Sequence, residues 1–213
     1  MALLDTRRLT CSYVVLNNPS MASGEEPQFT PNFVSTLFDL PQTTAVSPGP
    51  EGMVISAPGN KAPRIFSFSP MKLQIQNDTP QLVQQTTERV LVHFRKVGFT
   101  INPRAYGLNY ELDFKVSGAD DAETWLARRF ATSGLKNLGQ STVALQSMTL
   151  KFTSYGKLQT LKLEPRIGET DRLFAYVNMN FDESRLLRGE QLEGEMENWF
   201  EKAKSMLAQL LEE

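Results

Sequence analysis

The clearest hydrophobic pattern in the chain is a strict alternation over residues 107–116. Its apolar positions are Leu108, Tyr110, Leu112, Phe114 and Val116, and the polar positions between them are Asn109, Glu111, Asp113 and Lys115. Successive side chains of a strand point to opposite faces, so this pattern is typical of an antiparallel sheet with one face in solvent. We expect the apolar set in the core, with Glu111 and Asp113 in water.

Several shorter segments carry similar patterns and predict further strands. They are residues 12–16, 53–58, 64–69, 71–76, 143–153, 157–163 and 172–181. The links at residues 59–63 and 155–157 are short and contain glycine, which is typical of hairpins. Strands joined in this way favour antiparallel pairing.

Helix signals separate these groups of strands. Asp78, Thr79 and Pro80 predict a helix start, because a capping side chain precedes a proline in the first turn. That helix should end near Gly98. Further helices are expected at residues 32–38, from Asp120 or Asp121 to residue 131, and from Gly189 onwards.

The order of these elements predicts an α+β fold. We expect mostly antiparallel sheet, built from hairpins and covered by two or three helices. Each half of the chain runs from strands into a helix, so a two-lobed pseudo-repeat remains an option, although no residue-level repeat supports it.

The first 52 residues differ from the rest in composition. The stretches 18–31 and 41–52 are rich in proline, glycine and serine, which oppose both helix and ladder. We therefore predict an irregular N-terminal arm with a short strand over residues 1–52, packed on an α+β domain over residues 53–213. Both stretches should lack regular structure.

Composition limits the partners and the compartment. The formal net charge is −2 and the pI is near 5.6, so no global field attracts nucleic acid or an anionic membrane. No run of apolar residues reaches the length of a membrane span, and the N-terminal residues do not form a secretory signal. The single cysteine, Cys11, allows no intramolecular disulfide. We expect a cytoplasmic protein that binds neither nucleic acid nor membrane.

The residue inventory also narrows the chemistry. A single histidine, His93, excludes any site that needs two, and no glycine-rich phosphate loop occurs. Ser69 and Lys72 have the spacing of Ser/Lys acyl enzymes, but their flanks are strand-like, whereas that chemistry needs a helix. No cofactor and no metal are expected.

One polar set suggests catalysis. Glu111, Asp113 and Lys115 project from one face of a strand about 7 Å apart, which resembles half of the acid-x-Lys pattern of metal-dependent nucleases. Such a site needs a further carboxylate, and Asp78 and Glu88 are the upstream candidates. The alternative interpretation is a solvated sheet face with cross-strand ion pairs.

The terminal helix carries a broad apolar face. Its seam and flanking positions are Leu192, Met196, Trp199, Phe200, Ala203, Met206, Leu207 and Leu210. Their spacing is typical of helices that pack lengthwise on another element. This face either covers the chain's own sheet or contacts a second copy or a partner. Adjacent residues point about 100° apart, so we expect one flat contact to bury only one of Trp199 and Phe200.

These patterns favour a non-catalytic binding or assembly protein over an enzyme. It would act through protein–protein contacts or self-association at a sheet edge, the N-terminal arm or the terminal helix. One alternative is a metal-dependent nuclease or phosphodiesterase that uses the acidic strand. Another is a carrier of a small apolar ligand or peptide, for which a pocket with convergent polar groups would be the distinguishing observation.

Overall fold

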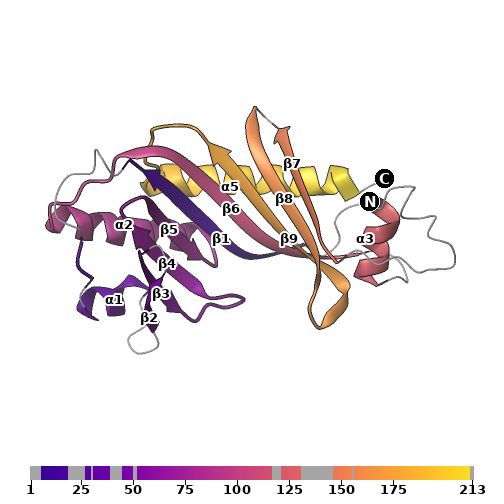
Figure 1. Cartoon of the computed structure of the whole chain (residues 1–213), viewed down its shortest axis with the longest axis horizontal. Helices are drawn as coiled ribbons and strands as arrows, with labels where there is room; N and C mark the ends of the chain where they lie inside the picture. The colour runs from indigo at the N-terminus through magenta and orange to yellow at the C-terminus, as the bar shows by residue number, and fades with distance from the viewer. Residues whose placement is uncertain are drawn as a thin grey trace.

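One antiparallel sheet organises the molecule. The computed structural model describes residues 6–18, 27–29, 31–38, 45–49, 52–116, 121–130, 146–154 and 156–211. In these residues nine strands form a sheet of order β2-β3-β4-β5-β1-β6-β9-β8-β7 (Figure 1). The strands are β1 (Arg7–Asn17), β2 (Ala45–Gly49), β3 (Gly52–Ala57), β4 (Arg64–Ser69), β5 (Lys72–Asn77), β6 (Pro103–Lys115), β7 (Met148–Ser154), β8 (Lys157–Arg166) and β9 (Glu169–Phe181). The predicted α+β fold with antiparallel pairing is confirmed.

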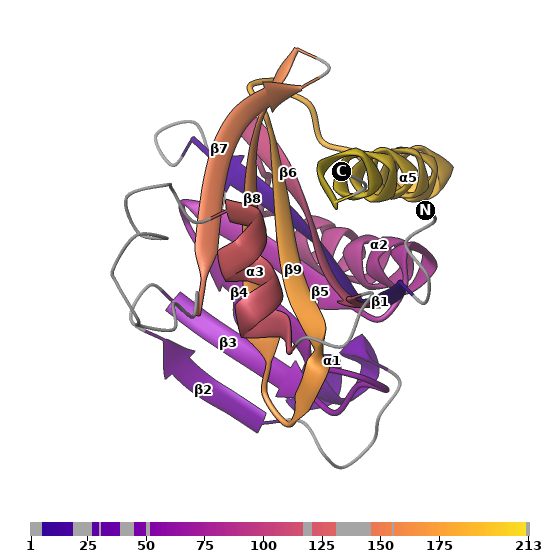
Figure 2. The same ribbon diagram turned by 90° about the vertical axis from the view of Figure 1, so that its right-hand side faces the viewer.

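The helices lie mainly against one face of this sheet. They are α1 (Pro31–Leu37), α2 (Pro80–Lys96), α3 (Ala122–Phe130) and α5 (Gly189–Leu211). Figure 2 shows α2 and α5 side by side, and the two helices are in contact. The apolar side chains of the central strands point toward these helices and form the core. The alternating set from Leu108 to Phe114 in β6, and Val116 directly after the strand, is buried as predicted.

The N-terminal segment differs from its prediction. The strand expected over residues 12–16 spans Arg7–Asn17 and lies in the middle of the sheet, paired with β5 and β6. Cys11, Tyr13 and Val15 are fully buried, so this part of the chain is not an outer arm. Leu9 and Cys11 continue the alternation of Tyr13 and Val15, with Arg8 and Thr10 at the positions between them, so the same pattern extends the strand toward Arg7. The domain boundary expected at residue 52 stays a prediction.

The stretch 41–52 also contains regular structure. Ala45–Gly49 forms β2, an edge strand paired with β3. An edge strand tolerates a residue without an N–H such as Pro48, since one side of its backbone has no ladder to complete. Residues 19–26, 30, 41–44, 50 and 51 lie outside the described residues, as do 143–145 and Tyr155 of the expected last hairpin.

Local sequence accounts for the limits of α2. The Thr79 side chain accepts a hydrogen bond from Leu82 N at 3.2 Å, and Pro80 fills the first turn, where its missing N–H costs nothing. Gly98, with φ of 73°, ends the helix in the left-handed conformation that glycine allows. The strands before and after α2 belong to one continuous sheet, so the two halves considered as lobes share a single core.

Candidate functional site

The strand proposed for metal chemistry has its carboxylates already engaged. Asp113 is buried rather than wet, which corrects the prediction. Its Oδ1 accepts from Arg172 Nη2 at 2.7 Å, and its Oδ2 accepts from Arg166 Nη1. The arginines come from β9 and from the end of β8. Both carboxylate oxygens are therefore neutralised by guanidinium groups.

The other members of that set are paired as well. Glu111 Oε2 accepts from Thr10 Oγ1 at 2.8 Å, and Lys115 forms an ion pair with Asp171 at 2.9 Å. Of the upstream candidates, Glu88 accepts from the backbone N–H of Gly189 at 2.8 Å. No group of three or more His, Cys, Asp or Glu residues that could hold a metal ion occurs in the described part of the chain. The contacts of Glu111 and Lys115 are the kind of cross-strand pairs that the alternative interpretation of this face expected.

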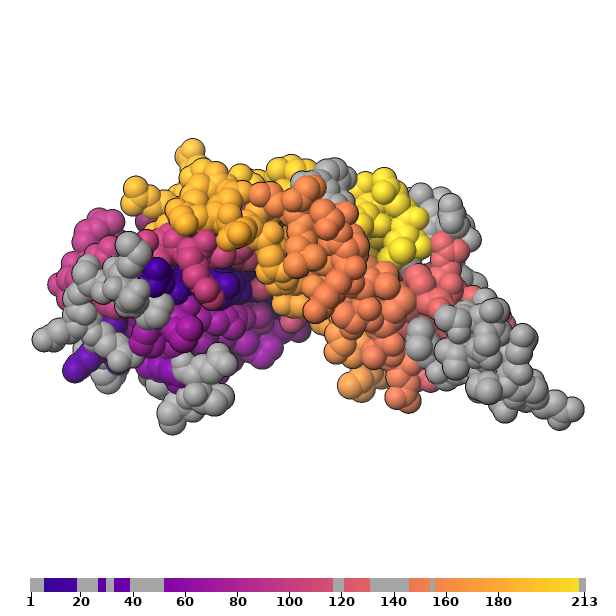
Figure 3. Space-filling model, turned by 45° about the horizontal axis from the view of Figure 1, so that its top comes forward, coloured from indigo at the N-terminus to yellow at the C-terminus, as the bar shows by residue number. Residues whose placement is uncertain are grey.

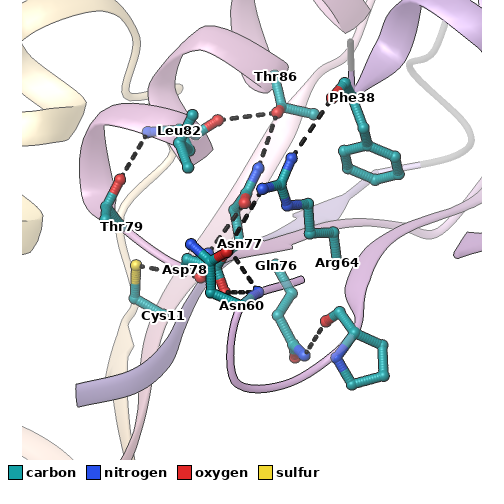
Figure 4. Close-up of polar contacts among 11 residues, drawn as sticks. Cys11, Phe38, Asn60, Arg64, Gln76, Asn77, Asp78, Thr79, Leu82 and Thr86 are labelled. Atoms are coloured by element: carbon teal, nitrogen blue, oxygen red, sulfur yellow. Dashed lines mark hydrogen bonds and ion pairs between the residues drawn. The ribbon is translucent and has the colours of Figure 1, made fainter. Parts of the chain in front are cut away.

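Asp78, the second upstream candidate, belongs to a structural junction (Figure 4). Its carboxylate accepts from Asn60 N at 3.2 Å and from Arg64 Nη2 at 3.4 Å. A Cβ at Gly59 would stand 2.1 Å from the carbonyl oxygen of Ala62, so the turn requires glycine there. The junction ties the β3–β4 loop to the start of α2.

The isolated reactive residues are also structural. Burial raises the pKa of the Cys11 thiol far above its usual range, which disfavours the nucleophilic thiolate. His93 stacks on Phe33 with ring centroids 4.1 Å apart, and its Nε2 lies 3.0 Å from the carbonyl oxygen of Gln28. Ser69 and Lys72 are cross-strand partners in the β4–β5 hairpin and do not share the helix that Ser/Lys acyl chemistry needs.

The contact residues expected on the terminal helix divide into two groups. Six are buried within the chain itself: Leu192, Met196, Trp199, Phe200, Ala203 and Leu207. Met206 and Leu210, near the end of α5, are half-buried. The seam therefore packs on the chain's own core for most of its length and leaves its last turns partly open.

Trp199 and Phe200 are both buried, which contradicts the expectation that only one could be. Trp199 packs edge-on to Phe181 at 5.2 Å, whereas Phe200 lies 5.7 Å from the Tyr110 ring. The Arg8 guanidinium covers Phe200 at 4.7 Å from its centroid. Both rings are covered because they contact different strands: Trp199 contacts β9, whereas Phe200 contacts β6 and Arg8 of β1.

The partly open end of α5 faces the last strand of the sheet across a groove. The groove has a volume of about 530 Å³ and is lined by Leu150, Lys151, Phe152 and Thr153 of β7 and by Met206, Gln209 and Leu210 of α5. In the space-filling view of Figure 3, the orange residues of this part of the sheet stand beside the yellow end of α5. We call this site the β7–α5 groove.

The strand beside the groove is a sheet edge. Among the described strands β7 pairs only with β8, so the other side of its backbone has no strand partner there. Leu150 and Phe152 point toward the helix-covered face, whereas Thr149, Lys151 and Thr153 are exposed on the other. An edge strand next to an apolar groove can accept an added strand and bury its alternate side chains.

Comparisons with known proteins add no evidence about the function of this chain. A scan against protein-family models and a search of curated proteins find no match to the chain. Within the described residues, no helix is both long and apolar enough to cross a membrane.

Proposed function

We propose that this chain is a non-catalytic binding protein that takes an extended segment of a partner protein as an additional strand beside β7. The observation that carries the proposal is the β7–α5 groove: an edge strand with an apolar groove along one side. Backbone hydrogen bonds to β7 would supply affinity, and the groove would select the partner's side chains.

The two faces of β7 determine which peptide sequence would fit beside it. Side chains of the added strand that face α5 would contact Leu150, Phe152, Met206 and Leu210, so alternate positions should be apolar. Positions between them would lie on the face that carries Lys151, where an acidic residue would be favoured. The proposed ligand is an extended peptide of alternating apolar and acidic or neutral polar residues.

A partner protein fits this edge better than a second copy does. Two β7 strands could pair antiparallel around a two-fold axis, and Lys151 is the middle residue of Met148–Ser154. The register that pairs every residue would place the two Lys151 side chains directly opposite each other. Like charges in that position are destabilising, and lysine on an edge strand is a known guard against such pairing.

We place this activity in the cytoplasm, on the ground that the sequence has a single cysteine. One cysteine makes no intramolecular disulfide, and proteins of oxidising compartments often depend on such links.

Selection from a displayed library of random nine-residue peptides tests the proposal. Selected peptides should alternate apolar and acidic residues, and their affinity can be measured by fluorescence polarisation. Leu210→Glu should weaken binding by at least about tenfold, because a carboxylate would occupy the apolar groove. Ile167→Glu is the matched control, since Ile167 is 100% exposed on the β8–β9 turn and does not line the groove.

A charge exchange gives the sharpest result. Lys151→Glu should shift the selected peptides from acidic to basic residues at the positions facing residue 151. Peptides whose binding is insensitive to Leu210→Glu and whose charge preference survives Lys151→Glu would contradict the proposal.

A further inference from the structure

A second pocket lies at the other end of α5, against the C-terminal end of α2. It has a volume of about 270 Å³. Its lining is largely apolar and consists of Leu91, Phe94, Phe99, Ile101 and Leu186, together with Arg95, Gly98, Thr100 and Arg188. Phe94 and Phe99 are buried and form its floor, whereas Leu91, Ile101 and Leu186 are half-buried. The pocket therefore combines apolar walls with cationic groups.

The end of α2 shapes this pocket. Phe99 N donates to the carbonyl oxygen of Phe94 at 2.9 Å, and Gly98 N donates to that of Arg95 at 3.2 Å. This is the Schellman arrangement, with the expected apolar contact: the Phe94 and Phe99 rings lie 5.2 Å apart. Because these terminal carbonyl oxygens already have donors, they repel an anion less than unpaired helix-end carbonyls would.

The two arginines at this pocket differ from the arginines that pair with carboxylates elsewhere in the described residues. Arg64, Arg166, Arg172 and Arg185 form ion pairs with carboxylates of the same chain. The exposed Arg95 and Arg188 side chains have neither a hydrogen bond nor an ion pair within the described ranges.

The carboxylate that could neutralise them has another partner. Glu88 lies two helical turns before Arg95, and Gly189 directly follows Arg188. The Glu88 carboxylate accepts from the Gly189 backbone N–H at 2.8 Å, and it forms no ion pair with either guanidinium in the described structure. Among the residues that the structure describes, two positive charges therefore remain without a carboxylate partner at one apolar pocket.

We infer that this pocket binds a small amphipathic carboxylate. The apolar tail would contact Leu91, Ile101 and Leu186, and the carboxylate would face Arg95 and Arg188. Guanidinium groups are suited to carboxylates because their parallel N–H groups match the two oxygens. Binding of an apolar tail would remove half-exposed apolar side chains from water, and this burial is favourable in free energy. Together the two features select a ligand with both parts over a simple anion or a neutral apolar molecule.

Ligand titrations followed by NMR test this assignment on the whole chain. The probes are hexanoate, octanoate and phenylbutyrate, with octanamide as the uncharged match of octanoate and inorganic phosphate as an anion without a tail. At least one carboxylate should shift the backbone amide resonances of Gly98, Thr100 and Arg188 in a saturable way. Octanamide and phosphate should each bind at least about tenfold more weakly than the best carboxylate, because each lacks one half of the interaction.

Variants that remove one positive charge then test whether Arg95 and Arg188 bind the carboxylate group. Arg95→Gln and Arg188→Gln should each weaken the best carboxylate by about tenfold, the effect of losing a charge-assisted hydrogen bond. Lys96→Gln is the matched control, since Lys96 is exposed, adjacent to Arg95 and outside the pocket lining. It removes the same charge and should leave the affinity within about twofold. Unchanged thermal unfolding of all three variants would show that folding is not the cause.

Four results would overturn the inference. They are no saturable shift with any of the three carboxylates, equal binding of octanoate and octanamide, equal binding of octanoate and phosphate, and equal weakening by Lys96→Gln and Arg95→Gln. Because this pocket and the β7–α5 groove lie at opposite ends of α5, either assignment can fail while the other holds.

Discussion

The centre of the sheet and its β7 edge are covered by the same helix in different ways. Over β6 and β9 the first turns of α5 bury Leu192, Met196 and Trp199 almost completely. Beside β7 the last turns leave Met206 and Leu210 half-buried along a groove. One apolar stripe thus has two surroundings: it completes the core where the sheet continues beneath it, and it borders an open groove where the sheet ends, the place where we propose that a partner strand binds.

Removing the helix is the largest test of this comparison. A chain that ends before Glu190 should lose cooperative thermal unfolding, because it exposes the apolar core that α5 covers. Circular dichroism would report the loss. A truncated chain that stays folded would mean that the core is complete without α5.

The buried ion cluster makes the centre sensitive to charge. Asp113→Ala should cost about 3–5 kcal/mol of unfolding free energy, because it leaves the Arg172 guanidinium buried without its main carboxylate. Asp171→Ala is the control, since Asp171 pairs with Lys115 at the surface, and its cost should be much smaller. Urea unfolding measures both, and equal costs would refute the role assigned to Asp113.

Substitution of two methionines of α5 compares the stability contributed by its core-facing turns with that of its last turns. Met196 is fully buried, so Met196→Ala should cost about 2–5 kcal/mol. Met206 lines the groove, so the same substitution there should cost less than half as much. Equal losses in urea unfolding would show that the last turns of α5 are also core.

The smallest expected effect concerns pH. Tyr110 donates its hydroxyl to the carbonyl oxygen of Met196 at 2.8 Å, and burial raises the pKa of Tyr110 well above 10.0. Above about pH 10 the unfolded chain releases this proton while the folded chain keeps it. Stability should therefore fall as pH rises further, by about 1.4 kcal/mol per pH unit for this group.

Tyr110→Phe provides the check on this pH dependence. At pH 8 the variant should be slightly less stable than the original chain, because phenylalanine lacks the hydroxyl that donates to Met196. Between pH 10 and pH 12 its stability should decline less steeply. An unchanged slope in urea unfolding would show that Tyr110 does not contribute to alkaline unfolding.

Much of the fold can be predicted from the local pattern of apolar and polar residues, whereas the contacts of Asp113 and the β7–α5 groove cannot. Alternation from Leu108 to Val116 defined the buried face of β6, because burial on one side requires apolar residues at every second position. The same pattern misplaced Asp113, since its partners Arg166 and Arg172 lie more than 50 residues away and only strand pairing brings them near. Sequence predicted a strand and a broad helix face at the groove. It could not reveal that β7 is an edge, because strand order depends on long-range pairing.

The most direct test of strand addition is amide hydrogen exchange along β7. In the free protein, alternate N–H groups of Met148–Ser154 face away from β8 and should exchange fast, while those between them are protected. A peptide selected as described above should slow the fast set and leave the protected set unchanged. Protection of that alternate set on binding is the result that the proposal predicts. Tight peptide binding without any change in β7 exchange would contradict it.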